Sequence, residues 1–220
     1  LTPFYVKTNR GDSVGTEIIQ PFFSLETAYA MGVAWERTID ESILYRNGEE
    51  YSKFVLANRT VVAGYGVRMP VDQVFVQRLE VGWHSQRDRF STLDKTVAGT
   101  LPADRELSGP SIGYSWVQPA YIKETYVNRM ERVEDFNLGN ELSVYSGYMA
   151  KPFASDRDRL IISAVNQQGV FIMPGRFALG QIGLTGRVAG SHWDNALMFA
   201  NLNLFWKTTW LYPQTWVSHV

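Results

Sequence analysis

The chain has 220 residues, with 21 Lys and Arg against 22 Asp and Glu, so its formal net charge is −1. The missing basic surplus argues against a nucleic-acid binder, and the absence of cysteine excludes disulfides, thiolate metal sites and a cysteine nucleophile. Apolar residues make up 45% of the chain, which argues against disorder, and no run of about 20 apolar residues predicts a transmembrane helix.

The first clear pattern along the chain is an alternation at 25–36. One set of positions is mostly large and apolar, and the interleaved set is small or charged. A period of two is typical of a β-strand with two different faces. The large set is Leu25, Thr27, Tyr29, Met31, Val33 and Trp35, and the other set is Glu26, Ala28, Ala30, Gly32, Ala34 and Glu36.

Similar but weaker alternation predicts further strands down the chain, and helical periodicity is nowhere convincing. Asn47-Gly48 and the segment 68–72 are predicted turns, and Ser85–Leu107 is a predicted long, charged loop. We therefore expect an all-β chain of about ten strands, forming one domain over 1–220. The further strands are expected at 51–69, 73–85, 110–119, 121–131, 137–149, 157–171, 177–188, 195–207 and 208–219.

Two features favour a transmembrane barrel over a soluble sheet. The polar face of the alternation carries Gly, Ala and Ser as well as charges, which suits a crowded barrel interior. Aromatic residues gather towards the predicted strand ends, as in the girdles of outer-membrane barrels; they are Trp35, Trp83, Trp116, Tyr148, Trp206, Trp210 and Trp216. Because a sheet in lipid cannot leave an open edge, we predict a closed antiparallel up-and-down meander. The alternative is a soluble β-sandwich or lipocalin-like binding protein, with the apolar face as its core.

Three segments carry a family resemblance: 44–49 (LYRNGE), 78–83 (RLEVGW) and 131–139 (ERVEDFNLG). With these, the chain resembles the bacterial surface-antigen family of outer-membrane barrels, which includes the BamA and TamA assembly factors. The resemblance implies a sixteen-stranded barrel, of which this chain is expected to be a large segment without the periplasmic domains of the family. The Arg-Gly-aromatic loop motif of the family has no counterpart, since Arg10-Gly11 is followed by Asp12.

By this resemblance, the chain is a component of protein assembly or translocation across the bacterial outer membrane. Its implied partners are outer-membrane lipid, periplasmic domains and unfolded client proteins, with no nucleic acid, cofactor or metal. The alternation supplies the candidate lumen-lining residues, whose simplest role is to hydrate the interior. They are Glu26, Glu36, Glu141, Arg187, Asn201 and Lys207.

An outer-membrane enzyme that hydrolyses lipid or peptide is the remaining alternative. Gly109–Gly113 matches the letters of a nucleophile elbow, but Ser111 lies in an alternating strand with no helix after it. A rim site could combine His84, Asp88 and His192, although no two histidines have metal-ligand spacing. We expect no catalytic residue and no enzyme activity.

Overall fold

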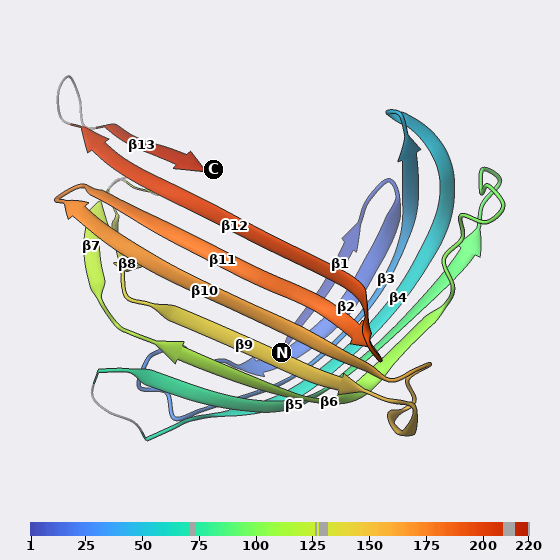
Figure 1. Cartoon of the computed structure of the whole chain (residues 1–220), viewed down its shortest axis with the longest axis horizontal. Helices are drawn as coiled ribbons and strands as arrows, with labels where there is room; N and C mark the ends of the chain where they lie inside the picture. The colour runs from blue at the N-terminus through green and yellow to red at the C-terminus, as the bar shows by residue number, and fades with distance from the viewer. Residues whose placement is uncertain (71–73, 126, 128–131, 209–213, 220) are drawn as a thin grey trace. The chain divides into compact units, whose positions relative to one another are not determined.

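A computed structural model describes residues 1–70, 74–125, 127, 132–208 and 214–219. It is all-β, and its longest strands have 17 to 20 residues. Figure 1 shows these strands in chain order. They are β1 (Thr2–Lys7), β2 (Gly11–Gln20), β3 (Tyr29–Arg46), β4 (Glu49–Arg68), β5 (Val76–Thr92), β6 (Arg105–Val117), β7 (Tyr121–Thr125), β8 (Val133–Asn137), β9 (Glu141–Met149), β10 (Arg159–Met173), β11 (Arg176–Ala189), β12 (His192–Thr208) and β13 (Gln214–His219).

Eleven of these strands form one sheet in the order β1-β2-β3-β4-β5-β6-β9-β10-β11-β12-β13, and β7 and β8 form a separate hairpin. The sheet is an antiparallel meander, which confirms the predicted fold class at this level. A single turn of 3-10 helix, Lys151–Phe153, precedes β10. No helix in the described ranges is long and apolar enough to cross a membrane.

The turn between β3 and β4 shows how local chemistry sets the register of a long strand pair. Asn47 and Gly48 both have positive φ, at 55° and 84°. Two such residues in a row make the hairpin turn that matches strand twist, and Asn-Gly is the preferred sequence for it. The predicted turn is confirmed, and β3 and β4 pair continuously from Arg46↔Glu49 to Tyr29↔Val67, with one bulge at Leu44/Tyr45.

The chain divides into two compact units. Unit 1 comprises Leu1–Val67, Glu80–Ile112 and Gly147–Leu160, and it contains β1, β2 and β3 whole. Unit 2 comprises Arg68–Leu79, Gly113–Ser146 and Ile161–Val220, and it contains β7, β8, β11, β12 and β13 whole.

In unit 1 three large apolar side chains of β3 are exposed to solvent. Tyr29, Met31 and Val33 are 44%, 50% and 53% exposed, whereas the small residues between them are partly buried. We call the side of the sheet that carries these three residues the apolar face of unit 1, and the opposite side its polar face. A soluble sandwich would bury the apolar face, so this strand does not behave as that alternative requires.

Unit 2 repeats the arrangement on β11 and β12. Ile182, Met198 and Leu202 are 62%, 79% and 41% exposed, and they mark what we call the apolar face of unit 2. Gln181 and Asn201 are cross-strand partners on the other side, the polar face of unit 2.

The largest buried apolar cluster described lies on the polar face of unit 2. Phe177 of β11 and Phe205 of β12 stack at 4.4 Å between ring centroids, and Phe136 of β8 packs against both. Leu138 completes the cluster. The β7–β8 hairpin therefore covers this end of β11 and β12. This explains why Phe205 interrupts the apolar alternation of β12: the hairpin, and not lipid or water, is its partner.

Several sequence predictions of strand existence and extent are wrong. The prediction missed β1, β2 and β8, where alternation is poor, and it stopped β3 at Glu36 although the strand continues to Arg46. Leu25, Glu26 and Thr27 lie in the turn before β3 and not in the strand. The predicted loop Ser85–Leu107 is shorter, because β5 runs to Thr92 and β6 begins at Arg105.

The aromatic prediction holds at some positions and fails at others. Trp116, Tyr148 and Trp206 lie one or two residues from the ends of β6, β9 and β12, as expected. Trp35 and Trp83 lie well inside β3 and β5, because these strands are longer than predicted. Parts of the predicted segments, 71–73, 126, 128–131 and 209–213, which include Trp210, lie outside the described residues.

Candidate functional site

A row of hydrogen-bonded polar side chains crosses the polar face of unit 1, and we call it the polar ladder. It begins on β2, where Ser13 Oγ donates to Glu36 Oε1 at 2.8 Å and lies 3.0 Å from Thr38 Oγ1. Thr38 is the register partner of Asn58 on β4, whose Oδ1 accepts from Thr60 Oγ1 at 3.0 Å. The ladder exists because antiparallel pairing brings every second residue of neighbouring strands to the same face.

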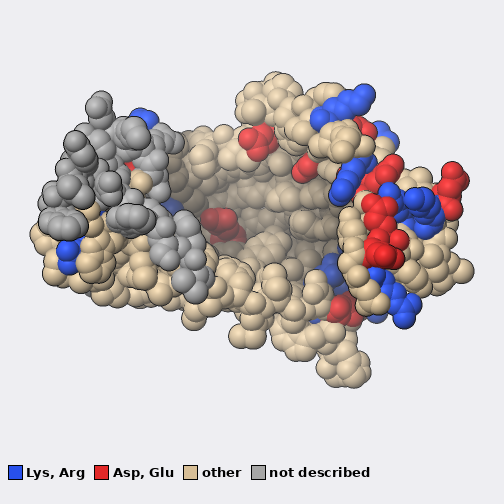
Figure 2. Space-filling model, turned by 90° about the horizontal axis from the view of Figure 1, so that it is seen from above, with Lys and Arg blue, Asp and Glu red and all other residues tan. Residues whose placement is uncertain are grey.

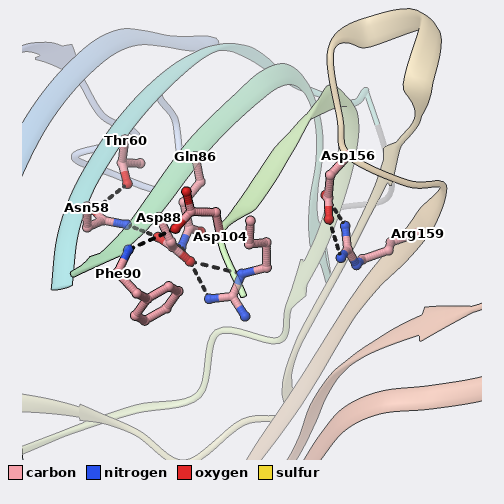
Figure 3. Close-up of polar contacts among 9 residues, drawn as sticks. Asn58, Thr60, Gln86, Asp88, Phe90, Asp104, Asp156 and Arg159 are labelled. Atoms are coloured by element: carbon pink, nitrogen blue, oxygen red, sulfur yellow. Dashed lines mark hydrogen bonds and ion pairs between the residues drawn. The ribbon is translucent and has the colours of Figure 1, made fainter. Parts of the chain in front are cut away.

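Asp88 of β5 is the central residue of the polar ladder. It is 1% exposed, and its carboxylate accepts from Asn58 Nδ2 at 2.6 Å and from Gln86 Nε2 at 2.9 Å. Arg105 of β6 donates through Nε at 2.9 Å and forms an ion pair through Nη2. Figure 3 shows these side chains converging on Asp88. A buried carboxylate is tolerated only when its lone pairs are filled in this way.

The connection between β5 and β6, residues 93–104, folds back onto β4 beside the polar ladder. Val97 N donates to Ser52 Oγ at 3.0 Å, Ser52 Oγ lies 2.7 Å from Thr100 Oγ1, and Thr96 Oγ1 donates to the Lys53 carbonyl at 2.5 Å. As a result Ser52 is only 1% exposed. With the hydrogen bond from Lys53 N to the Lys95 carbonyl at 3.2 Å, four polar contacts hold this twelve-residue connection against the end of the polar face.

The apolar face also turns charged at the far ends of β5 and β6. Arg87 Nε lies 2.9 Å from Glu106 Oε1, and Arg89 pairs with the same carboxylate. Arg89 Nε lies 3.5 Å from Asp104 Oδ2, and Phe90 N donates to Asp104 Oδ1 at 2.9 Å. Figure 2, seen from above, shows Lys, Arg, Asp and Glu gathered most densely at the right of the view. Both faces of the sheet therefore carry charged side chains at these strand ends.

The loop before β10 is held to β6 by a pair of serines, and a buried arginine stabilises the loop itself. Arg159 is 3% exposed and donates to both oxygens of Asp156, at 2.5 and 2.9 Å (Figure 3). The hydrogen bond from Arg159 holds the pKa of the Asp156 carboxyl below its ordinary value. Ser155 Oγ accepts from Ser108 N at 2.7 Å and donates to Ser108 O at 2.9 Å.

The candidate lumen residues occupy different settings. In unit 1, Glu36 is part of the polar ladder, whereas Glu26 lies exposed in the turn before β3, off the strand that the pattern predicted for it. In unit 2, Glu141 accepts from Asn137 Nδ2 at 2.6 Å, and Asn201 donates to Gln181 at 2.8 Å. Two more lie on β11 and β12: Arg187 opposite Asn195, and Lys207 with its Nζ 3.1 Å from Thr125 Oγ1.

Sequence reasoning named Asp88 only as a possible rim residue with His84 and His192, and it missed the partners that surround Asp88 in the structure. Asp88 and Arg105 fell inside a predicted loop, and Asn58 was part of a strand without a role. The alternation of Gln86, Asp88 and Phe90 with Arg87 and Arg89 continues the period of β5. That period was the available signal, but acidic and basic residues on opposite faces look like a solvated loop.

The residues considered for catalysis have separate settings in the structure. Ser111 lies inside β6 and not at a strand-to-helix turn, so the nucleophile-elbow geometry is missing there. Asp88 is saturated by its donors, and His192 opens β12. No group of three or more His, Asp or Glu able to hold a metal occurs in the described part of the chain.

Comparisons of the chain with protein-family models, with curated proteins and with solved structures found no match. The function must therefore be argued from the side chains themselves, and two observations are available for this. They are the exposed apolar faces of both units and the polar ladder on the opposite face of unit 1.

Proposed function

We propose that this chain is a transmembrane antiparallel β-barrel of the bacterial outer membrane, or a large segment of one. The observation that carries the proposal is the exposure of large apolar side chains on alternate positions of long strands, as at Met31, Val33, Ile182 and Met198. Contiguous apolar surface of this kind is rare on soluble monomers and marks contact with a membrane or a partner. Lipid is the partner that fits these exposed positions on β3, β11 and β12.

The polar faces support the same proposal. A barrel in lipid turns its polar side chains inward, and the polar ladder and the Gln181–Asn201 pair lie opposite the apolar faces. Glu36 and Asn201 then line a wet interior, which is the role expected of them. The unpaired edges of β1 and β13 in the sheet order require closure, by each other or by further strands, because lipid offers no hydrogen bonds.

Within this class, we propose a role in protein assembly or translocation of the surface-antigen type. The support is the resemblance of segments 44–49, 78–83 and 131–139. Residues 47 and 48 of the first segment form the turn between β3 and β4, and 78–83 lies in β5. The partners are outer-membrane lipid, periplasmic domains and unfolded client proteins.

Lipid exposure can be tested residue by residue, because the chain contains no cysteine. Val33→Cys and Ala34→Cys place one thiol on each face of β3. A bimane label at position 33 should be quenched by brominated lipid in proteoliposomes, whereas the same label at position 34 should not. Equal quenching at both positions, or a chain that stays dispersed and folded without detergent, contradicts the barrel.

The assembly role needs a separate measurement. Proteoliposomes that contain the chain should speed the folding of a second, urea-unfolded outer-membrane barrel compared with empty liposomes of the same composition. Liposomes with a barrel of unrelated function are the matched control. An identical folding rate in all three preparations contradicts the assembly role and leaves the barrel untouched.

A further inference from the structure

An arginine pair interrupts the apolar face of unit 1. On β3, Arg37 follows Val33 and Trp35 with the period of two, and its register partner on β4 is Arg59. Both side chains are exposed. Like charges directly opposite each other destabilise an antiparallel pair, so this arrangement lowers the stability of the β3–β4 pair.

Neither arginine is neutralised by the chain. In the described ranges, Arg37 and Arg59 make no ion pair or side-chain hydrogen bond, and the acidic residues Asp12 and Glu41 further along the same face do not reach them. This differs from Arg87, which has Glu106 as a partner at 2.9 Å. The guanidinium groups of the pair are therefore free to bind an external anion.

A third arginine extends the pair to β5. The hydrogen bond between Asn58 and Asp88 places these two residues side by side on the polar face. Arg59 comes directly after Asn58 and Arg87 directly before Asp88, so both project together from the opposite face. Arg37, Arg59 and Arg87 thus form one row across three strands, which we call the arginine row. The Glu106 carboxylate that pairs with Arg87 also pairs with Arg89.

The position of the row along the strand identifies the anion. Tyr29 and Tyr65 stack at the other end of the apolar face of unit 1. The eight-residue separation between Tyr29 and Arg37 spans roughly 26 Å of strand. At a strand tilt of about 40°, this corresponds to roughly 20 Å of membrane thickness, close to the apolar band of an outer-membrane barrel. The arginine row then lies where acyl chains end and headgroups begin.

We propose that the arginine row binds the phosphate group of an anionic lipid headgroup at this membrane boundary. Guanidinium groups bind phosphate oxygens in a bidentate manner, and adjacent arginines can share one phosphomonoester. The arginine row adjoins the apolar face of unit 1, and this favours a lipid over free phosphate. Acyl chains can contact Val33 and Val61 while the phosphate contacts the arginine row. The inference rests on the proposed membrane location of this face.

The test uses the full chain in dodecyl maltoside micelles that contain phosphatidic acid, with phosphatidylcholine as the neutral comparison. Native mass spectrometry measures bound lipid. With about a fivefold effect for each arginine near a lipid surface, Arg37→Gln/Arg59→Gln should weaken phosphatidic acid binding roughly 25-fold. Arg46→Gln is the matched control, because it removes the same charge from the end of β3, and it should leave binding unchanged.

Three outcomes overturn the inference: equal phosphatidic acid binding by the double variant and the parent, an equal loss in the Arg46→Gln control, or full displacement by millimolar inorganic phosphate. A heat-dependent gel shift identical to that of the parent shows that the double variant is folded. The quenching of a label at position 33 by brominated lipid is measured in parallel. Intact quenching with unchanged lipid binding refutes the arginine row alone, whereas lost quenching in the parent chain refutes the barrel.

Discussion

The polar faces of the two units are filled in different ways. In unit 1 the buried group on the polar face is ionic. It is the Asp88 carboxylate, which accepts hydrogen bonds from Asn58, Gln86 and Arg105. In unit 2 it is aromatic, with Phe177 and its neighbours covered by the β7–β8 hairpin. The same alternating strands therefore support two kinds of filling. The ionic network is destabilised when any one partner of Asp88 is removed, whereas the stability of the aromatic cluster depends on the volume of its side chains.

The largest effect is expected from Arg105→Ala in unit 1. This change leaves the Asp88 carboxylate buried without its ionic partner, and we expect a loss of about 3–5 kcal/mol in the free energy of unfolding. Denaturant unfolding in detergent, followed by tryptophan fluorescence, measures it. Arg87→Ala is the control, because that side chain is exposed at its ion pair, and it should cost under about 1 kcal/mol. Equal losses in the two variants would show that Asp88 is not the centre of the ladder.

A smaller effect is expected from Phe177→Leu in unit 2. The substitution keeps an apolar side chain but loses ring volume and the stack with Phe205, so we expect a loss of about 1–2 kcal/mol. The same unfolding measurement applies, with Phe23→Leu at an exposed position as the control. A loss as large as that of Arg105→Ala would remove the distinction between the two fillings.

Acidification should weaken an ionic contact of unit 1 and leave the aromatic cluster of unit 2 unchanged, because the cluster has no titratable group. The pKa of Asp156 is lowered by its hydrogen bond to Arg159, so its contribution is present above the ordinary pKa and is lost as the pH falls through the lowered one. The protection factor for hydrogen exchange in the loop 150–158, which is the exchange rate corrected for its intrinsic pH dependence, should therefore fall below about pH 4. In Asp156→Asn this pH dependence should disappear, with a change of under about 1 kcal/mol at pH 7. A loop whose exchange responds to pH equally in both proteins contradicts the assignment.

The smallest effect is expected from Arg59→Gln on the apolar face of unit 1. Removing one of two opposed like charges should raise the free energy of unfolding by a few tenths of a kcal/mol in lipid-free detergent. Added phosphatidic acid should reverse the order, because it stabilises the parent more than the variant. A variant that is less stable than the parent in neutral detergent would show that the arginines do not repel each other.

The sequence was informative where the pattern is local. Alternation at Tyr29, Met31 and Val33 predicted both the strand and its two faces, and Asn47-Gly48 predicted the hairpin turn. It was uninformative at β1 and β2, where polar, apolar and small residues do not alternate cleanly. Charges at 87–89 were interpreted as a loop because a strand with charges on both faces has no simple pattern.

What the sequence alone determined is the class of the fold and, where the alternation is clean, the side of the strand on which a residue lies, because the period of two depends only on neighbours in the chain. Tertiary structure decided which polar residues meet. Asn58, Asp88 and Arg105 come from three strands, and their contact depends on register. It also decided that the 93–104 connection folds onto β4 and that a hairpin covers Phe177. These contacts join residues 17 to about 50 positions apart, and no local pattern encodes such pairings.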